Sequence, residues 1–269
     1  MRKYGYLVVE GPHDVEFAYR LLSPFGLNRV RYKTPHKDKP KEEVLDEKFH
    51  CLIPNYPGEE GDIQVRPPIP LFLQNQTHSI AIHSAMGDDR LIELIEETNW
   101  KFKINSMIGI GILLDSDKAV PAQKRYANVK TKLADVLSQQ LFILPDDAGT
   151  IKKGQPNLGA FVLPDNQAAG TLEDLLLESA EQIYPCLLKM AKNYVSDAKH
   201  NAGLRNSDLK ELKNAGEKKA IVGAMANIMR PGRAVQVSIQ DNDWLKGKAL
   251  EIERIKSAQN FLKRLFELT

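Results

Sequence analysis

Two apolar runs that each end in an acidic residue constrain the fold of this chain more than any other feature. Residues 4–9 lead directly into Glu10, and residues 107–114 lead directly into Asp115. A short apolar run bounded by turn residues predicts a strand that is buried on both faces of a parallel sheet. In open α/β sheets the functional crevice lies outside the carboxyl ends of such strands. The two acids are therefore expected at a functional edge of the sheet.

Alternating strand and helix patterns extend this expectation through residue 180. Apolar runs predict strands, and apolar positions three and four residues apart predict the intervening helices. Together they predict an α/β fold, a Rossmann-like parallel sheet flanked by helices. The expected strands are 4–9, 78–83, 107–114 and 161–163, and the expected helices are about 14–22, 89–98, 122–137, 172–177 and 248–268.

A change of composition within the first half suggests an insertion. Residues 31–70 carry clustered charges and repeated prolines that interrupt every pattern. We expect a catalytic domain over residues 1–180 with this insertion, followed by a mostly helical extension over 181–269 packed on it. The insertion is either functional or partly mobile, because an unstructured loop of that length is unusual in a compact domain. Its role as a lid, dimer arm or substrate-binding loop is left open.

Composition excludes several classes of protein. The chain has 269 residues, 42% of them hydrophobic, and a net charge of +2 that does not by itself identify a nucleic-acid binder. Cys51 and Cys186 lack metal-type spacing and are expected to be reduced. No apolar run approaches the roughly 20 residues of a membrane span, and the first one stops at Glu10, too early for a signal peptide. We therefore expect a cytoplasmic protein with no membrane partner.

The acids at the two strand ends predict a metal site. Glu10, Asp14, Asp115 and Asp117 would repel one another unless a cation neutralised them. Carboxylates two residues apart on a strand point to the same side and suit a hard cation such as Mg²⁺ or Mn²⁺. The alternatives are structural, because Asp14 would complement a helix dipole and the second acidic pair would make an ordinary turn.

A later pair of acids, Glu173 and Asp174, opens a helix after Thr171, a suitable N-cap residue. The pair either complements the helix dipole or supplies ligands for a second metal ion. In contrast, Gly109 and Gly111 lie inside a strand without the third glycine of a dinucleotide-binding loop, so we interpret them as close-packing positions.

Basic residues concentrate between residues 186 and 235. They form either a solvated helical face or a phosphate-binding patch. Lys218 or Lys219 would also be able to stabilise charge on a transferring phosphoryl group. The candidates for nucleic-acid binding are Lys199, His200, Arg205, Arg230 and Arg233.

The motif Glu10-Gly11-x-x-Asp14 after an apolar strand, followed about a hundred residues later by Asp115-x-Asp117, resembles the Toprim domain. The resemblance covers roughly residues 3–180. The run from Thr171 to Leu176 is similar to small stand-alone Toprim proteins related to OLD-family nucleases. No ATPase domain, topoisomerase tyrosine domain or zinc motif is recognisable, which argues against topoisomerase and primase.

The resemblance implies a role for each matched residue. Glu10 would be the general acid/base or a metal ligand, and Asp115 and Asp117 would hold Mg²⁺. Asp14 and Glu173, with Asp174 beside it, would assist a second ion. OLD-type nucleases also have a late lysine, for which Lys218 and Lys219 are the candidates.

The leading hypothesis is a nuclease that uses Mg²⁺ or Mn²⁺ to hydrolyse phosphodiester bonds of DNA or RNA. It would act alone, as a homodimer, or as the effector of a larger complex under the control of a protein partner. The non-enzymatic alternative is a nucleic-acid-binding or scaffold module of the same fold. A phosphatase in which the first Asp attacks phosphorus is a minor alternative, because it leaves Glu10 without a role.

Overall fold

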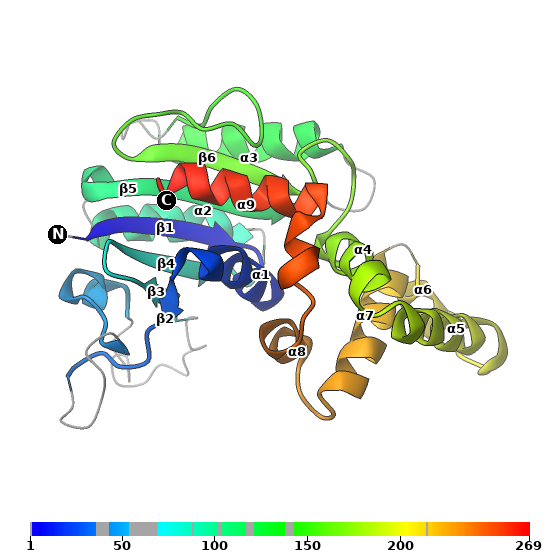
Figure 1. The fold of residues 1–269 in the computed structure, drawn as a ribbon. Coiled ribbons are helices and arrows are strands. Elements are labelled where there is room, and N and C mark those ends of the chain that lie inside the picture. The colour runs from blue at the N-terminus through cyan, green and yellow to red at the C-terminus, as the bar shows by residue number, and fades with distance from the viewer. Residues whose placement is uncertain are drawn as a thin grey trace, which may run out of the picture.

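The computed structural model describes residues 2–35, 43–53, 69–87, 89–101, 104–116, 121–137, 143–213 and 215–269. It contains a six-stranded mixed sheet with the strand order β2-β3-β4-β1-β5-β6 (Figure 1). Neighbouring strands among β4, β1, β5 and β6 pair in parallel, whereas β3 is antiparallel to both of its neighbours. The predicted α/β architecture is therefore confirmed. The strands are β1 Lys3–Val9, β2 Asn28–Arg29, β3 Leu71–Gln74, β4 His78–Ser84, β5 Met107–Asp115 and β6 Asn157–Leu163.

Helices cover both faces of this sheet and create two hydrophobic cores. Helices α1 (Pro12–Leu22) and α9 (Glu253–Leu265) pack on one face, and α2 (Asp89–Lys101) and α3 (Ala122–Leu137) pack on the other. Successive strand residues point to opposite faces, so an apolar run buried on both sides contributes to both cores. This explains why the continuous apolar runs identified the central strands.

The remaining helices gather beyond the carboxyl ends of the parallel strands, at the right of Figure 1. The predicted helical character of this C-terminal region is confirmed, while the division into units at residue 180 stays a prediction. No helix in the described part of the chain is long and apolar enough to span a membrane. These helices are α4 Leu172–Ile183, α5 Pro185–Asn201, α6 Asn206–Glu211, α7 Ala215–Met229 and α8 Val235–Asp241.

Helix α9 and the residue after it pack against three strand glycines, Gly5, Gly109 and Gly111, which we call the glycine floor. A Cβ atom added to Gly109 would lie 2.4 Å from the Leu265 carbonyl oxygen, and one added to Gly111 would lie 2.4 Å from Leu265 Cδ2. A Cβ atom on Gly5 of β1 would likewise overlap the Phe266 ring. The glycines therefore let α9 approach the backbone of the sheet, which confirms their interpretation as close-packing positions.

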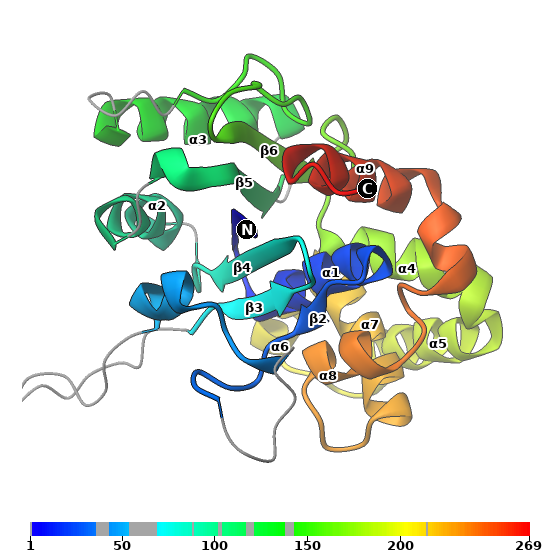
Figure 2. The ribbon, with the colours of Figure 1, turned by 60° about the vertical axis from the view of Figure 1, so that its left-hand side comes forward.

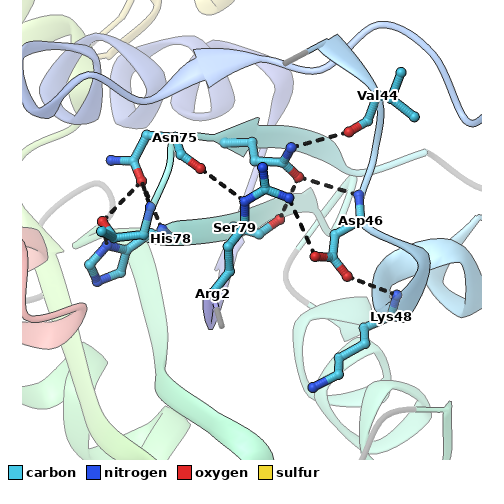
Figure 3. A network of polar contacts seen from close by, with 9 residues as sticks. Arg2, Val44, Asp46, Lys48, Asn75, His78 and Ser79 are labelled. Atoms are coloured by element: carbon cyan, nitrogen blue, oxygen red, sulfur yellow. Dashed lines mark hydrogen bonds and ion pairs between the residues drawn. The ribbon is translucent and has the colours of Figure 1, made fainter. Parts of the chain in front are cut away.

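A polar network attaches the 43–53 segment to the β3–β4 hairpin (Figure 3). Arg2 donates from Nε to the Asn75 carbonyl at 3.0 Å and from Nη1 to Asp46 Oδ2 at 3.4 Å. The side chain of Gln74 accepts from the Asp46 backbone N–H and donates to the Val44 carbonyl at 3.1 Å. This described part of the predicted insertion is thus fixed to the edge of the sheet, while residues 36–42 and 54–68 lie outside the described residues.

Two elements begin four or five residues away from the expected position. The last helix begins at Glu253 rather than at residue 248, because residues 247–251 form a 3₁₀ turn and Ile252 is extended, with φ −61° and ψ 126°. Strand β6 begins at Asn157 rather than at residue 161. Its first residues include Gly159, whose added Cβ would lie 2.7 Å from the Thr150 carbonyl oxygen. Tertiary packing allows this glycine in a strand, although its intrinsic strand preference is low.

The glycine floor predicts a specific loss of stability for Gly109→Ala. We expect the free energy of unfolding to fall by about 1 to 3 kcal/mol, because the new methyl group would overlap a backbone carbonyl of α9. The measurement is urea denaturation followed by circular dichroism. Gly223→Ala is the matched control, since an added Cβ there meets no atom within 4 Å and alanine favours its helix. Equal stabilities of the two variants would contradict this packing.

Candidate functional site

The candidate site lies at the carboxyl edge of the sheet, between β1 and β5. Both strands run in parallel, so Glu10 after β1 and Asp115 at the end of β5 reach the same edge. The helices that follow these strands, α1 and α3, depart to opposite faces of the sheet. Such a departure opens a crevice at the ends of the strands, which is where α/β proteins bind ligands.

Asp14 belongs to the first turn of α1 and is turned back toward the strand end. The Gly11 backbone N–H donates to Asp14 Oδ2 at 2.9 Å, and the side chain is buried. Burial and the nearby Glu10 and Glu173 carboxylates raise the pKa of Asp14 to about 7. A dipole-complementing carboxylate at an exposed helix start would not be expected to have its pKa raised in this way.

Asp115 ends β5 and meets the start of α4. The Leu172 backbone N–H donates to Asp115 Oδ1 at 2.9 Å. Burial, followed by the Asp14 and Glu173 carboxylates, raises the pKa of Asp115 to about 8, although the Leu172 N–H and Lys219 oppose this shift. Asp115 and Asp14 therefore lie close enough to repel each other at the ends of β1 and β5.

Glu173 is the third carboxylate of the group and lies in the first turn of α4. Its side chain is only 4% exposed. The Thr171 hydroxyl donates to Glu173 Oε2 at 2.7 Å, and Lys219 Nζ lies 3.0 Å from Glu173 Oε1. The neighbouring Asp174 instead accepts from the Thr171 backbone N–H and pairs with Lys218. The two adjacent acids therefore have different environments. Of the two, only Glu173 contributes to the raised pKa values of Asp14 and Asp115.

Lys218 and Lys219 extend from α7 to the first turn of α4. Burial disfavours the charged form of Lys219, but the carboxylates of Glu173, Asp115 and Asp14 outweigh that effect and raise its pKa. Lys219 therefore stays positively charged beside these three carboxylates. His13 lies beside Glu173 and Lys219, and burial lowers its pKa. It is therefore mostly neutral at physiological pH.

An arginine that the sequence did not indicate completes the site. Arg125 Nη2 of α3 donates to Glu10 Oε1 at 2.7 Å, and its Nε donates to the Asp115 backbone carbonyl at 3.2 Å. The contact spans 115 residues of sequence. Arg125 stands in the predicted helix 122–137 without any pattern that distinguishes it from a surface arginine. Glu10 is therefore held in an ion pair with Arg125 while its charge still acts on Asp14.

The other predicted residues divide into two groups. Asp117 lies outside the described residues. The basic candidates do not gather in one place, since Lys199 pairs with Glu217 near the start of α7 and Arg230 follows the end of α7. Thirteen residues of helix separate those two positions, about 20 Å. His200 contacts the Ser196 carbonyl, Arg205 pairs with Asp208, and Arg233 is exposed.

The donor set suits a hard cation. Carboxylate oxygens are the ligands that Mg²⁺ and Mn²⁺ prefer, and Mg²⁺ commonly uses only one or two of them beside water and phosphate. Within the described ranges, no group of three or more His, Cys, Asp or Glu side chains is spaced to form a ready metal cage. The chemistry of the ligands therefore fits, whereas a cage made wholly of protein groups is absent from the described residues.

Comparisons with known proteins give a family and a fold. A family model described as "Protein of unknown function (DUF3226)" matches residues 4–267. No curated protein matches the chain. A hypothetical protein from Pyrococcus horikoshii OT3 has a similar fold, with a TM-score of 0.51, 14% identity, and coverage of 98% of this chain and 95% of that one.

A second solved structure is more distant. It is the C-terminal region of the Xanthomonas campestris pv. campestris OLD protein, with 13% identity and coverage of 98% of this chain and 96% of that one. Its TM-score of 0.37 is too low to support an argument.

The raised pKa of Asp115 predicts how stability depends on pH without metal. The folded pKa of about 8 exceeds the ordinary value of 3.8, so this group makes the protein less stable as pH rises between those values. Asp115→Asn removes the charge and still accepts from Leu172. We expect it to stabilise the protein by up to about 4 kcal/mol more at pH 8 than at pH 5, because the two values are three pH units apart and each unit is worth about 1.4 kcal/mol.

Urea denaturation in EDTA at both pH values measures this difference. Asp146→Asn is the control, because Asp146 is fully exposed and its pKa is lowered by Lys130. If Asp115→Asn gave the same stability change at pH 5 and pH 8, the burial of this carboxylate would be refuted.

Proposed function

The chain belongs to the DUF3226 family, and from its site we propose that it is a divalent-metal-dependent nuclease that hydrolyses phosphodiester bonds of DNA or RNA. One observation carries the proposal. Asp14, Asp115 and Glu173 come from three different elements and are buried close enough to raise the pKa of both aspartates. Such a group of acids is costly in a protein without a cation to neutralise it, and perturbed groups of this kind cluster at functional sites.

The motifs agree with this proposal. By the Toprim resemblance, the acid in the first turn of the first helix lies near the acid that ends the third parallel strand. These acids are Asp14 and Asp115 in this chain. Asp14 and Asp115 have this relation in the structure. The position of Asp117 and the Toprim assignment itself remain parts of the proposal.

One or two of the three carboxylates would hold Mg²⁺ or Mn²⁺ beside water and phosphate, and each is oriented by the backbone or by a neighbouring side chain. Gly11 fixes Asp14 Oδ2, Leu172 fixes Asp115 Oδ1, and Thr171 fixes Glu173 Oε2. A bound ion would supply an activated water molecule and neutralise the phosphoryl oxygens. Because the acids are oriented before a ligand arrives, little side-chain entropy is lost on binding.

Charged residues around the carboxylates would contact the substrate or orient the groups that do. The lysine Nζ atom of Lys219, paired with Glu173, lies where it would approach a phosphate oxygen and offset developing negative charge. Arg125 fixes Glu10 Oε1 beside the Asp115 carbonyl. Glu10 would therefore position the strand end or accept a proton from water, while the other acids bind the ion.

One observation favours a non-catalytic alternative. The chain already supplies cations to its own acids, since Arg125 pairs with Glu10, Lys218 with Asp174 and Lys219 with Glu173. A module that only binds nucleic acid would retain these ion pairs without an ion. The two functions differ in whether the protein turns over its substrate.

Cleavage of labelled single- and double-stranded DNA and RNA in Mg²⁺, Mn²⁺ or EDTA tests the proposal. We expect cleavage with either ion and none in EDTA. Asp115→Asn and Glu173→Gln are each expected to lower the rate on the order of a hundredfold, because each removes a charge from the group that holds the ion. Products are resolved on denaturing gels.

Glu267→Gln is the matched control, since Glu267 is a partly exposed acid paired with Lys3 at the opposite edge of the sheet. Its rate should equal that of the unaltered protein. Metal-dependent binding of the substrates without any cleavage would instead support the binding module. Cleavage that persists in EDTA or in both site variants would contradict the nuclease.

A further inference from the structure

A second hollow, separate from the carboxylates, lies along the β2 edge of the sheet. Its volume is about 930 Å³, and it is bordered by the end of α1, by β2, by the β3–β4 hairpin and by the segment from Arg230 to α8. Figure 2 shows β2 beside α1, with α8 nearby. We call it the arginine cleft. A cavity of this size is within the range of about 300 to 1,000 Å³ that small-molecule ligands occupy.

Positive charge dominates the lining of the arginine cleft. Five arginines line it against two acids, Glu43 and Asp241. Glu43 lies 3.9 Å from Arg31, and Asp241 lies 3.3 Å from Arg230. Two further acids outside the lining pair with its arginines, because Asp46 contacts Arg2 and Glu16 contacts Arg29. The arginines are Arg2, Arg20, Arg29, Arg31 and Arg230.

Arg29 contacts both an aromatic ring and a carboxylate. Its guanidinium lies over the Tyr19 ring at 4.4 Å, and Glu16 accepts from its Nη2 atom. Arg29 Nε is buried and has no hydrogen-bond partner among the described residues. That atom has almost no accessible surface, so a ligand in the cleft would contact the terminal nitrogens instead. Glu16 accepts from only one of their four N–H donors, and the others are able to form charge-assisted bonds with an anionic oxygen. The geometry of Arg29 therefore points to an anion in the cleft.

The other arginines differ in how many donors they keep. Arg20 donates to the Ile239 and Gln240 carbonyls and so connects α1 to the end of α8 beside the cleft. Arg31 has a side chain that is 69% exposed and reaches only the distant Glu43 among the described ion pairs. Arg2 is held between Asn75 and Asp46, as Figure 3 shows. Arg29 and Arg31, which lie two residues apart along the β2 edge, are thus the candidates for contact with an anion.

Side-chain amides also line the cleft. They are Asn28, Gln74, Asn75, Gln76 and Gln240. The first three already use their amides in hydrogen bonds within the protein, whereas the amides of Gln76 and Gln240 make none among the described residues. An amide presents both donors and acceptors and is able to bond the edge of a nucleobase. A simple inorganic anion would use the arginines and leave Gln76 and Gln240 without a role. The combination fits a phosphate joined to a base.

We propose that the arginine cleft binds a nucleoside phosphate, with its phosphate on Arg29 and Arg31 and its base against Gln76 and Gln240. The ligand is either a free nucleotide or one unit of a single strand, which share this chemistry. The cleft lies close to the carboxylate site, because α1 carries Asp14 in its first turn and Arg20 six residues later, about 9 Å along the helix. Binding here does not depend on cleavage at the carboxylates.

Binding measurements in EDTA test the proposal without the metal-dependent reaction. Isothermal titration calorimetry is performed with AMP, ATP and inorganic phosphate, and fluorescence anisotropy with labelled hexathymidylate and hexauridylate. We expect saturable binding of AMP, of an oligonucleotide, or of both. Arg29→Gln and Arg31→Gln are each expected to weaken it about tenfold, which is about 1.4 kcal/mol.

One matched control tests whether the loss of any surface arginine would weaken binding. Arg264→Gln removes an exposed arginine of α9 and should leave the affinity unchanged. Arg31→Gln guards against misfolding of the Arg29 variant, because Arg31 is mostly exposed. Thermal melts of each variant verify its fold.

The set of probes that bind distinguishes a free nucleotide from one unit of a nucleic-acid strand. AMP binding without oligonucleotide binding supports a free nucleotide, and displacement of the oligonucleotide by AMP supports a strand that enters the same cleft. Binding of inorganic phosphate as tightly as AMP would refute a nucleoside ligand. Absence of saturable binding by every probe, or affinities that both cleft variants leave unchanged, would overturn the proposal.

Discussion

Repulsion among buried carboxylates is the interaction on which the properties of the functional edge depend. Asp14, Asp115 and Glu173 are brought together by the ends of β1 and β5 and the start of α4, in a place where burial already disfavours their charge. The protein offsets the repulsion by keeping protons on the aspartates and by placing Lys219 beside Glu173. The same surroundings that make the group costly without metal make it receptive to a divalent ion.

The rest of the fold holds these ends in position. The Leu172 N–H joins Asp115 to α4, and Ser116 Oγ exchanges hydrogen bonds with Gly170 just before that helix. Near the start of β5, α9 packs so closely that Gly109 has no room for a side chain. The strand that carries Asp115 is therefore fixed both along its length and at its functional end.

Sequence patterns predicted the elements that depend on local periodicity. The apolar runs identified β1, β4 and β5, and helical spacing placed α3 at its observed bounds. The start of the last helix was wrong, because a 3₁₀ turn precedes Glu253 although the apolar spacing continues through it. Among the site residues, Asp14, Asp115 and Glu173 share the functional edge because strand ends in a parallel sheet must meet there.

Other contacts between residues that lie far apart in the sequence were not predicted. Arg125 meets Glu10 across 115 positions, and nothing in the neighbourhood of either residue signals the other. The arginine cleft likewise draws its cations from the N-terminus, α1, the β2 edge and the segment after α7, whereas the sequence drew attention to a basic run after residue 186. Of that run, Arg230 is the member that lines the cleft.

Proton release on metal binding tests the carboxylate site most directly. Calorimetric titration of Mn²⁺ at pH 7, in two buffers that differ in ionisation enthalpy, counts the protons that leave as the ion binds. Since the pKa of Asp14 is about 7 and that of Asp115 about 8, binding should release on the order of one proton per ion. Asp115→Asn should bind more weakly and release fewer. Absence of binding, or binding without proton release, would show that these acids are not metal ligands.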